Sequence, residues 1–327
     1  MKAAFYERKG AARDVLRISE VETPRPAEGE VLVRVHASGV NPSDTKRRGT
    51  LLGAEMPFPR IIPHQDGAGV IEAVGPGVPN ERIGERVWLF MAQWQRPFGT
   101  AAQYVSLPAF NAVPLPGNTE FTEGACLGIP AITAHYCLEM AMPLEGKRVL
   151  VAGGMGAVGF YAVQLARRAG AEVIATVSTP EQELQVRALG ATHVLQRRNG
   201  NLAAAIMEAT RGEGVHHIVE VAFGENLAAN VEVLRAGGSL ATFASDAQLE
   251  PVLPFHKLMY KDVKLHFALL YLAPREALRR ATAEITTALR AGQLRHSIAV
   301  RLPLERIVEA HEAVERGHNN GKVILDL

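Results

Sequence analysis

The sequence predicts an α/β protein that combines a doubly wound parallel sheet with a second, β-rich domain. Three observations carry this prediction. Residues 1 to about 120 contain short apolar runs separated by Gly and Pro. After about residue 122, strand and helix patterns alternate. A glycine-rich turn, AGGMGAVG, joins the first of these strands to the first helix.

The N-terminal part is predicted to form many short strands, as in an all-β barrel or sandwich. Gly and Pro between the runs favour turns. The clearest runs are EVLVRVHASGV (30–40), GAGVIEAVGPGV (67–78), GERVWLF (84–90) and AAQYVSLP (101–108).

The middle part alternates six predicted strands with helices, which indicates a complete doubly wound sheet. The strands are KRVLVAG (147–153), AEVIATVS (171–178), ATHVLQ (191–196), HHIVEVA (216–222), SLATFAS (239–245) and VKLHFALL (263–270). The helices are VGFYAVQLARRAG (158–170), PEQELQVRALG (180–190), NLAAAIMEAT (201–210) and ENLAANVEVLRAGG (225–238). The remaining tail, 273–327, mixes two amphipathic helices with two strands, and we expect it to return to the first domain.

Composition and charge limit the classes of partner and the cellular location that we expect for the protein. The 327 residues are 47% hydrophobic, which allows two packed cores. Lys and Arg number 35 against 34 Asp and Glu, so no nucleic-acid partner is expected. The two cysteines, Cys126 and Cys137, favour a reducing compartment, and we expect a cytoplasmic location. We expect neither a secretion signal nor a membrane span, since the N-terminus is charged and no long apolar run exists.

The glycine-rich turn is the strongest single motif. Gly154, Gly156 and Gly159 follow an apolar strand and open a helix, the context that a dinucleotide site requires. The first glycine permits the turn, the second lets the backbone approach a pyrophosphate, and the third lets helix and strand pack closely. The helix N-terminus adds free N–H groups for the phosphates.

The choice of dinucleotide depends on the end of the second strand, where NAD enzymes usually carry a carboxylate. Ser178 and Thr179 stand there instead. Glu181 is close, but Thr179 is predicted to cap a helix in which Glu181 has a structural role. Arg197 and Arg198, beyond the third strand, either contact a 2′-phosphate or are solvated surface. The pattern therefore favours NADPH over NADH.

The whole chain resembles the medium-chain dehydrogenase/reductase superfamily, in particular its quinone oxidoreductase (zeta-crystallin-like) family. The resemblance rests on HASGVNPSDTKRRG (36–49), PHQDGAGVIEAVGPGV (63–78), GTAAQYVSLP (99–108), GACLGIPAITAHY (124–136), AGGMGAVG and LPLERIVEAHEAVERGHNNGKVILDL (302–327). It implies a GroES-like catalytic domain of residues 1–121 with about 271–327, and a Rossmann domain of residues 122–270. It also implies an active site between the domains and a homodimer joined near Lys264 to Leu270.

The zinc ligands of related alcohol dehydrogenases are absent from the matching positions. Asn41 follows Gly39–Val40 where those enzymes have Cys, and Gln65 and Asp66 stand where they have His and Glu. His64 lies one residue away and is predicted to be a hydrogen-bonded structural residue. We therefore expect no metal, although a zinc alcohol dehydrogenase remains an alternative.

The resemblance also implies site residues. Asn41, Asp44 and Arg48 would lie on a catalytic loop near nicotinamide and substrate, where Lys46 replaces the family's usual tyrosine. Trp94 and Phe98 would line an acceptor pocket or simply pack. The cofactor would contact Gly154, Met155, Gly156, Ala157, Val158 and Gly159 of the turn, with Thr133, Ser178, Arg197, Arg198, Ala222, Phe243, Ser245 and Lys322.

These expectations favour a zinc-independent NADPH:quinone oxidoreductase. A conjugated acceptor spreads the incoming charge onto its own oxygen, so hydride delivery needs mainly positioning and a few donors. An NADPH-dependent enone or enal double-bond reductase is the nearest alternative, which Lys46 favours. A non-catalytic NADPH-binding protein with a regulatory, RNA-binding or structural role is the alternative from another class.

Overall fold

The chain divides into two compact units. The computed structural model describes residues 1–327 except 51–52, 54, 199 and 318. A β-rich unit comprises Met1–Ile129 and Thr282–Leu327, and a parallel-sheet unit comprises Pro130–Ala281. These limits fall later in the chain than the expected 121 and 270. The chain passes from one unit to the other inside two helices, α4 (Gly128–Glu139) and α10 (Arg275–Arg290). A sequence pattern shows no domain boundary inside a continuous helix.

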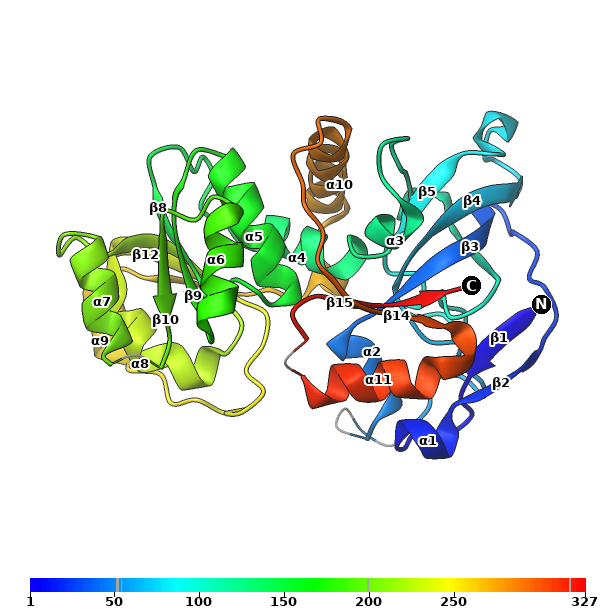
Figure 1. The fold of residues 1–327 in the computed structure, drawn as a ribbon, viewed down its shortest axis with the longest axis horizontal. Helices are drawn as coiled ribbons and strands as arrows, with labels where there is room; N and C mark the ends of the chain where they lie inside the picture. Colours follow the sequence, from blue (N-terminus) through cyan, green and yellow to red (C-terminus); the bar gives the residue numbers. More distant parts are fainter. Residues whose placement is uncertain (51–52, 54, 199, 318) are drawn as a thin grey trace. The chain divides into compact units, whose positions relative to one another are not determined.

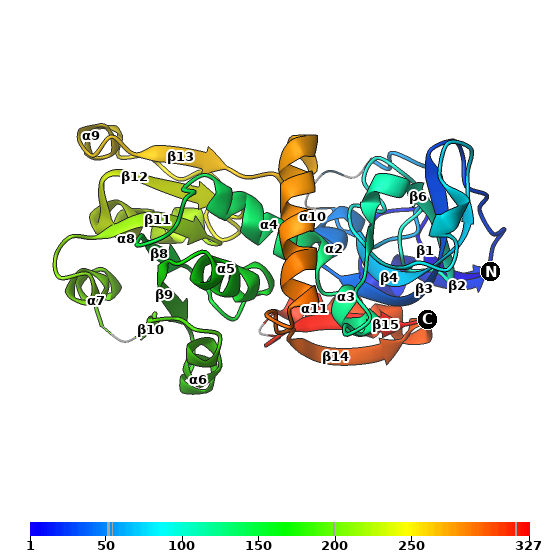
Figure 2. The ribbon, with the colours of Figure 1, turned by 90° about the horizontal axis from the view of Figure 1, so that it is seen from above.

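The parallel-sheet unit contains the predicted six-stranded sheet, in the order β10-β9-β8-β11-β12-β13. All neighbouring strands are parallel, and β10 and β13 form the two edges (Figure 2). Helices α5 and α6 lie on one face and α7 and α8 on the other (Figure 1). The strands are β8 (Arg148–Val151), β9 (Glu172–Val177), β10 (His193–Gln196), β11 (Val215–Glu220), β12 (Leu234–Thr242) and β13 (Lys264–Phe267). The helices are α5 (Ala157–Arg168), α6 (Pro180–Ala188), α7 (Leu202–Ala209), α8 (Phe223–Val233) and α9 (Phe255–Tyr260).

One boundary in this unit was predicted wrongly. The sequence placed residues 234–238 in a helix, but α8 ends at Val233 and Leu234 already begins β12. Leu234 pairs with Val215 of the neighbouring strand, and this tertiary pairing overrides the local helix preference. The side chains of Leu227 and Val231 still face the sheet, where they pack with Ile218.

The β-rich unit is built on a seven-stranded sheet in the order β14-β15-β3-β4-β5-β7, with β6 paired to β3. Its strands are β3 (Glu30–Val40), β4 (Asp66–Val74), β5 (Arg86–Leu89), β6 (Tyr104–Pro108), β7 (Ala112–Pro114), β14 (Ile298–Pro303) and β15 (Lys322–Asp326). A separate pair is formed by β1 (Lys2–Phe5) and β2 (Arg17–Glu20). Its helices are α1 (Ala12–Val15), α2 (Pro42–Arg48), α3 (Phe121–Gly124) and α11 (Ile307–Arg316). Short 3-10 turns occupy Asn80–Arg82, Ala109–Asn111 and Leu304–Arg306 in this unit, and Leu270–Leu272 in the parallel-sheet unit.

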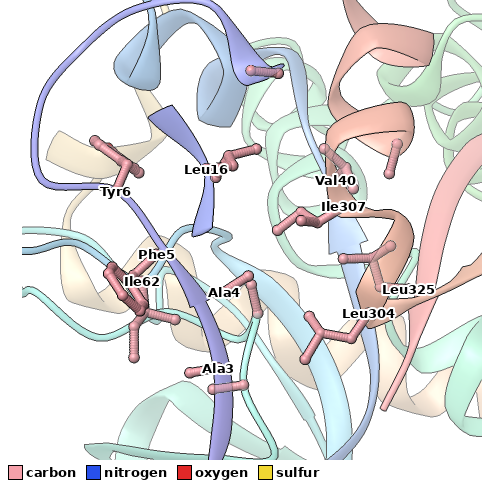
Figure 3. Close-up of a cluster of buried hydrophobic side chains, with 14 of the residues drawn as sticks. Ala3, Ala4, Phe5, Tyr6, Leu16, Val40, Ile62, Leu304, Ile307 and Leu325 are labelled. Carbon is pink, nitrogen blue, oxygen red and sulfur yellow. The ribbon is translucent and has the colours of Figure 1, made fainter. Parts of the chain in front are cut away.

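The C-terminal segment returns to the first domain, as predicted. β15 lies between β14 and β3, parallel to the first and antiparallel to the second. Figure 3 shows the core that forms there, where Phe5 and Leu16 from the N-terminal segment lie with Ile307 and Leu325 from the C-terminal segment. Residues from the two ends of the chain therefore share one hydrophobic core.

None of the helices in the described part of the chain is long and apolar enough to cross a membrane.

Candidate nucleotide and substrate sites

The glycine-rich turn is held against β9 by two hydrogen bonds that its backbone N–H groups donate to Thr176. The N–H of Gly153 donates to Thr176 Oγ1 at 3.0 Å, and that of Gly154 donates to the carbonyl of Thr176 at 2.8 Å. A Cβ on Gly159 would lie 2.2 Å from the Gly153 carbonyl oxygen, so only glycine fits. The close approach expected of the third glycine is therefore present.

Helix α5 begins directly after this turn with its first N–H groups uncapped by a side chain. Gly156 is the N-cap residue and is exposed, while Ala157 and Val158 are half-buried. Met155 is buried and anchors the turn. Because uncapped N–H groups and the helix dipole attract anions, the turn offers a phosphate site.

The end of β9 has the predicted helix start. Thr179 Oγ1 accepts from the Gln182 N–H at 3.3 Å, and the Ser178 N–H donates to Gln182 Oε1 at 2.8 Å. Thr179 also lowers the pKa of Glu181 by hydrogen bonding. Ser178 itself is exposed at the carboxyl edge of the sheet.

Two arginines lie beside this strand end. The Arg197 N–H donates to the carbonyl of Val177, the last residue of β9, at 2.9 Å. Arg197 and Arg198 are both exposed. The sheet therefore brings the backbone of Arg197, which Arg198 follows, to the end of β9, at the edge where doubly wound sheets bind ligands.

A buried carboxylate that the sequence analysis missed lies at the switch point of the sheet, between β8 and β11. Glu220 ends β11 and accepts from the Ala222 N–H at 2.6 Å. It also accepts from Asn226 Nδ2 at 3.0 Å and from Asn230 Nδ2 at 2.6 Å. A lone carboxylate at the end of an apolar strand was the available signal. Glu220 fixes the loop that contains Ala222.

Phe243 and Ser245 lie together at the carboxyl edge, beyond β12. Both line a pocket of about 430 Å³, whose wall includes Phe223 and Phe267. Ser245 Oγ accepts from the Gly224 N–H at 3.0 Å. Thr133 is buried in α4. The pocket is largely aromatic and aliphatic, which suits a flat ring.

In the β-rich unit, the segment expected to be a catalytic loop is a helix. α2 spans Pro42–Arg48, with Asn41 as its N-cap. The Asn41 N–H donates to Asp44 Oδ2 at 2.8 Å. A capping residue followed by proline and an acidic third position is a helix start, and this local signal outweighs the loop preference of Asn-Pro.

Asn41 belongs to a buried polar cluster, defined here as Asn41, Asp44, Asp66 and Lys322. Lys322 Nζ lies 2.5 Å from Asn41 Oδ1 and 2.8 Å from Asp66 Oδ2. Asn41 Nδ2 donates to the same Asp66 oxygen at 2.7 Å. The other Asp66 oxygen accepts from the Ile129 N–H at 2.8 Å. Lys322, expected at the cofactor, is therefore tied to two side chains of its own unit.

Asp44 is the least satisfied member of the buried polar cluster. Its Oδ1 is buried and has no hydrogen-bond partner among the described residues. Burial, with the negative charge of Asp66 as the next cause, raises the pKa of Asp44 to about 7. Asp44 can therefore carry a proton near neutral pH.

The three basic residues of α2 differ in their surroundings. Arg48 is buried and donates to the carbonyl of Gly10 and to Glu315, so it ties α2 to α11. Lys46 is half-buried. The Arg47 guanidinium lies 4.5 Å above the ring of Trp94, which is half-buried, while Phe98 is 41% exposed. Of these three residues, only Arg48 is fully buried.

His64 is a hydrogen-bonded structural residue, as predicted. Its Nδ1 lies 2.8 Å from Ser38 Oγ, and its Nε2 lies 2.9 Å from His311 Nε2. Burial lowers the pKa of His64 to about 3. Its backbone φ of 82° is strained for a residue with a Cβ. Cys126 and Cys137 are free and buried.

Two family models match the chain. Residues 27–117 match the alcohol dehydrogenase GroES-like domain, and residues 157–287 match the zinc-binding dehydrogenase family. The first match lies within the β-rich unit, and the second lies in the parallel-sheet unit except for its last residues, 282–287.

Individual relatives cover almost the whole chain. Human quinone oxidoreductase is 32% identical over 316 residues, covering 95% of this chain and 94% of that protein. A Burkholderia 2-haloacrylate reductase is 28% identical over 99% of this chain and 98% of its own length. A solved mycobacterial structure in complex with NADPH has a TM-score of 0.87 at 28% identity, with both chains fully covered.

Zinc, which one family model implies, does not suit the residues present. Asn41 and Asp66 occupy two of the ligand positions, and both accept hydrogen bonds from the Lys322 ammonium. A divalent cation would be repelled by that charge, and an amide oxygen is a poor substitute for a thiolate. Within the described part of the chain, no group of three or more His, Cys, Asp or Glu side chains is arranged to hold a metal ion.

Proposed function

Since the chain belongs to the quinone oxidoreductase family of the medium-chain dehydrogenases/reductases and is an oxidoreductase, we propose that it reduces quinones with NADPH, without zinc. The observation that carries the proposal is the tight glycine-rich turn at the start of α5, where a Cβ on Gly159 would meet the Gly153 carbonyl. Such a turn positions a dinucleotide pyrophosphate at the helix N-terminus.

NADPH is proposed over NADH because of the charges at the end of β9. Ser178 is exposed there, and Arg197 and Arg198 lie beside it. Glu181 lies in the first turn of α6, where Thr179 binds it. Two guanidinium groups and no strand-end carboxylate favour a 2′-phosphate by charge-assisted hydrogen bonds.

The reduced nicotinamide supplies a hydride, and a quinone additionally takes up a proton to become a hydroquinone. The protein's part is to orient the acceptor and to hold a proton for it. Asp44 holds a proton near neutral pH, while the Lys322–Asp66 pair fixes Asn41 beside it. We propose that the pocket at Phe243 and Ser245 belongs to the nicotinamide end of the site.

A double-bond reductase acting on a conjugated carbonyl is the second candidate. Lys46 stands where the family usually has tyrosine, and Arg47 lies one residue further on the same helix. Cations there favour an acceptor with a carboxylate or a polarised carbonyl oxygen. The similarity to a 2-haloacrylate reductase supports the same reading.

The first experiment is a thermal-shift titration with NADPH and NADH, followed by turnover of a naphthoquinone and an alkenal. We expect NADPH to stabilise the protein more than NADH does. Faster turnover of the quinone supports the first candidate, and faster turnover of the alkenal supports the second. If neither nucleotide binds, the proposal is wrong.

A matched pair of variants tests the choice of cofactor. Arg198→Gln removes a proposed 2′-phosphate contact, and Arg168→Gln removes an exposed arginine at the other end of α5. We expect Arg198→Gln to raise the Kd for NADPH about tenfold without changing that for NADH. Equal effects of the two variants would contradict the assignment.

We also propose a homodimer joined through β13. This strand is an edge of the sheet, and Phe267, Leu269 and Leu272 are exposed on and after it. An apolar open edge is a template for pairing with a second strand. Sedimentation of the wild type and of Phe267→Lys tests this, because a charge at the paired edge should shift the protein towards monomer.

A further inference from the structure

A basic pocket lies at the amino edge of the parallel sheet. It has a volume of about 470 Å³. Lys147 precedes β8, His216 lies near the start of β11, and Arg235 and Lys264 lie near the starts of β12 and β13. No Asp or Glu occurs among the described residues that line it. The glycine-rich turn lies at the opposite, carboxyl edge, so this pocket is separate from the proposed nucleotide site.

His216 in this pocket lies between two hydrogen-bond donors. The backbone N–H of Arg148 points to its Nδ1 at 3.1 Å, and the Arg235 guanidinium lies 2.7 Å from its Nε2. A neutral imidazole has one acceptor nitrogen and one N–H, and arginine offers only donors. One ring N–H therefore faces another donor, and the arrangement lacks an acceptor.

The local charge is positive as well. Burial, then the charges of Arg235, Arg148 and Lys147, lower the pKa of His216, against a smaller opposing effect of Glu213. Arg148 is neutralised by Glu213 and by Glu172, 3.7 Å away. Lys147 is half-buried and gives one of its three N–H groups to the Ala141 carbonyl at 2.7 Å. Arg235 and Lys264 are exposed at the rim.

We propose that this pocket binds a phosphate group, most favourably that of a small phosphate monoester. A phosphate oxygen between Arg235 and His216 would accept from both, which supplies the missing acceptor. Lys147 and Lys264 would contribute two further donors. The pocket also contains Met140 and Met142, which offer apolar surface to the organic part of such an ester.

The test uses the full chain saturated with NADPH, so that the proposed nucleotide site does not compete. Inorganic phosphate and glycerol phosphate are titrated at constant ionic strength against chloride. The ring resonance of His216 is followed by NMR and assigned with His216→Gln. We expect saturable shifts and a rise in the pKa of His216, because an anion favours the imidazolium. Tighter binding of glycerol phosphate indicates a metabolite, and equal binding indicates the free ion.

A charge-matched pair of variants controls for general electrostatics. Arg235→Gln should weaken phosphate binding about tenfold, since a charge-assisted hydrogen bond is lost. Lys257→Gln, an exposed lysine of α9 that lines a different pocket, should leave it unchanged. Absence of saturable shifts, or equal weakening by both variants, would overturn the proposal. Because His216 reports phosphate directly, failure to bind NADPH would count against the proposed function and not against this site.

Discussion

His64 Nε2 and His311 Nε2 lie 2.9 Å apart in the interior of the β-rich unit. Their protonation follows from their neighbours. Arg48 Nε lies 3.3 Å from His311 Nδ1 and can only donate, so that nitrogen accepts. His311 then carries its proton on Nε2 and donates to His64, whose own proton lies on Nδ1 and faces Ser38.

The hydrogen bonds continue beyond the histidines with the same direction of donation. Ser38 Oγ lies 2.7 Å from Thr100 Oγ1, and Thr100 donates to the Asp66 carbonyl. Because the chain of hydrogen bonds starts at a pure donor and ends at a pure acceptor, each proton has one position. Both histidines are neutral in this arrangement, and burial lowers the pKa of each.

The first prediction concerns acid stability. In the unfolded chain a histidine has a pKa of about 6.5, whereas the folded pKa of His64 is about 3. Between these values the unfolded state binds more protons, so the free energy of unfolding falls as pH falls. We expect His64→Gln to reduce this slope by about 1.4 kcal/mol per pH unit, measured by urea unfolding from pH 6 to 4. The exposed His256→Gln should leave the slope unchanged.

Asp44 should have the opposite pH dependence. Its folded pKa of about 7 exceeds that of an unfolded aspartate, so the folded state binds more protons between about pH 4 and 7. The free energy of unfolding therefore falls as pH rises through this range. Asp44→Asn keeps an acceptor for the Asn41 N–H and should be more stable than the wild type at pH 8, by at least about 1 kcal/mol. Asp14→Asn, at an exposed position, is the control and should follow the wild type. If Asp44→Asn also followed the wild type at every pH, a raised pKa of Asp44 would be excluded.

The Lys322–Asp66 pair should behave as a buried ion pair. Lys322→Met leaves the Asp66 carboxylate buried without its cation, which should cost about 3–5 kcal/mol in the free energy of unfolding. The double variant with Asp66→Asn should lose less than the sum of the two single changes. Lys2→Met, which breaks an exposed pair with Glu305, should cost much less, because solvent screens an exposed pair. Additive losses in the Lys322–Asp66 cycle would contradict the coupling.

Gly159→Ala tests the turn. Its Cβ would lie 2.2 Å from the Gly153 carbonyl oxygen, so α5 must move away from the turn. We expect weaker NADPH binding and a lower melting temperature, measured by calorimetry. Gly117→Ala is the matched control, because its Cβ would meet no atom within 4 Å. Unchanged NADPH affinity in Gly159→Ala would separate the turn from the nucleotide site.

Local sequence patterns were enough to predict most of the fold. The parallel sheet follows from alternating apolar runs and helices, and Thr179 and Gln182 form the helix start that their spacing predicts. α2 was missed although Asn41, Pro42 and Asp44 carry a capping signal, because seven residues are too few to show a helical period.

The buried polar cluster could not be derived from local patterns. Lys322 reaches Asp66 across 256 positions of sequence, and nothing near either residue indicates the other. The resemblance placed Asn41 and Lys322 at a site but not in contact. Only the pairing of β15 with β3 brings them together. Long-range strand pairing is the kind of information that a single sequence does not display.

The position of β15 between β14 and β3 also determines the order in which the chain can mature on the ribosome. The strands of the parallel sheet, β8 to β13, follow one another in the sequence with no strand of the other unit between them. The sheet can therefore be complete once Phe267 has left the ribosome. The β-rich unit must wait for β15, which follows every strand of the parallel sheet in the sequence. Until β15 has been synthesised, β3 lacks one of its neighbouring strands and Asp66 lacks its lysine partner, so a partly synthesised chain carries an unpaired strand edge of the kind that promotes aggregation.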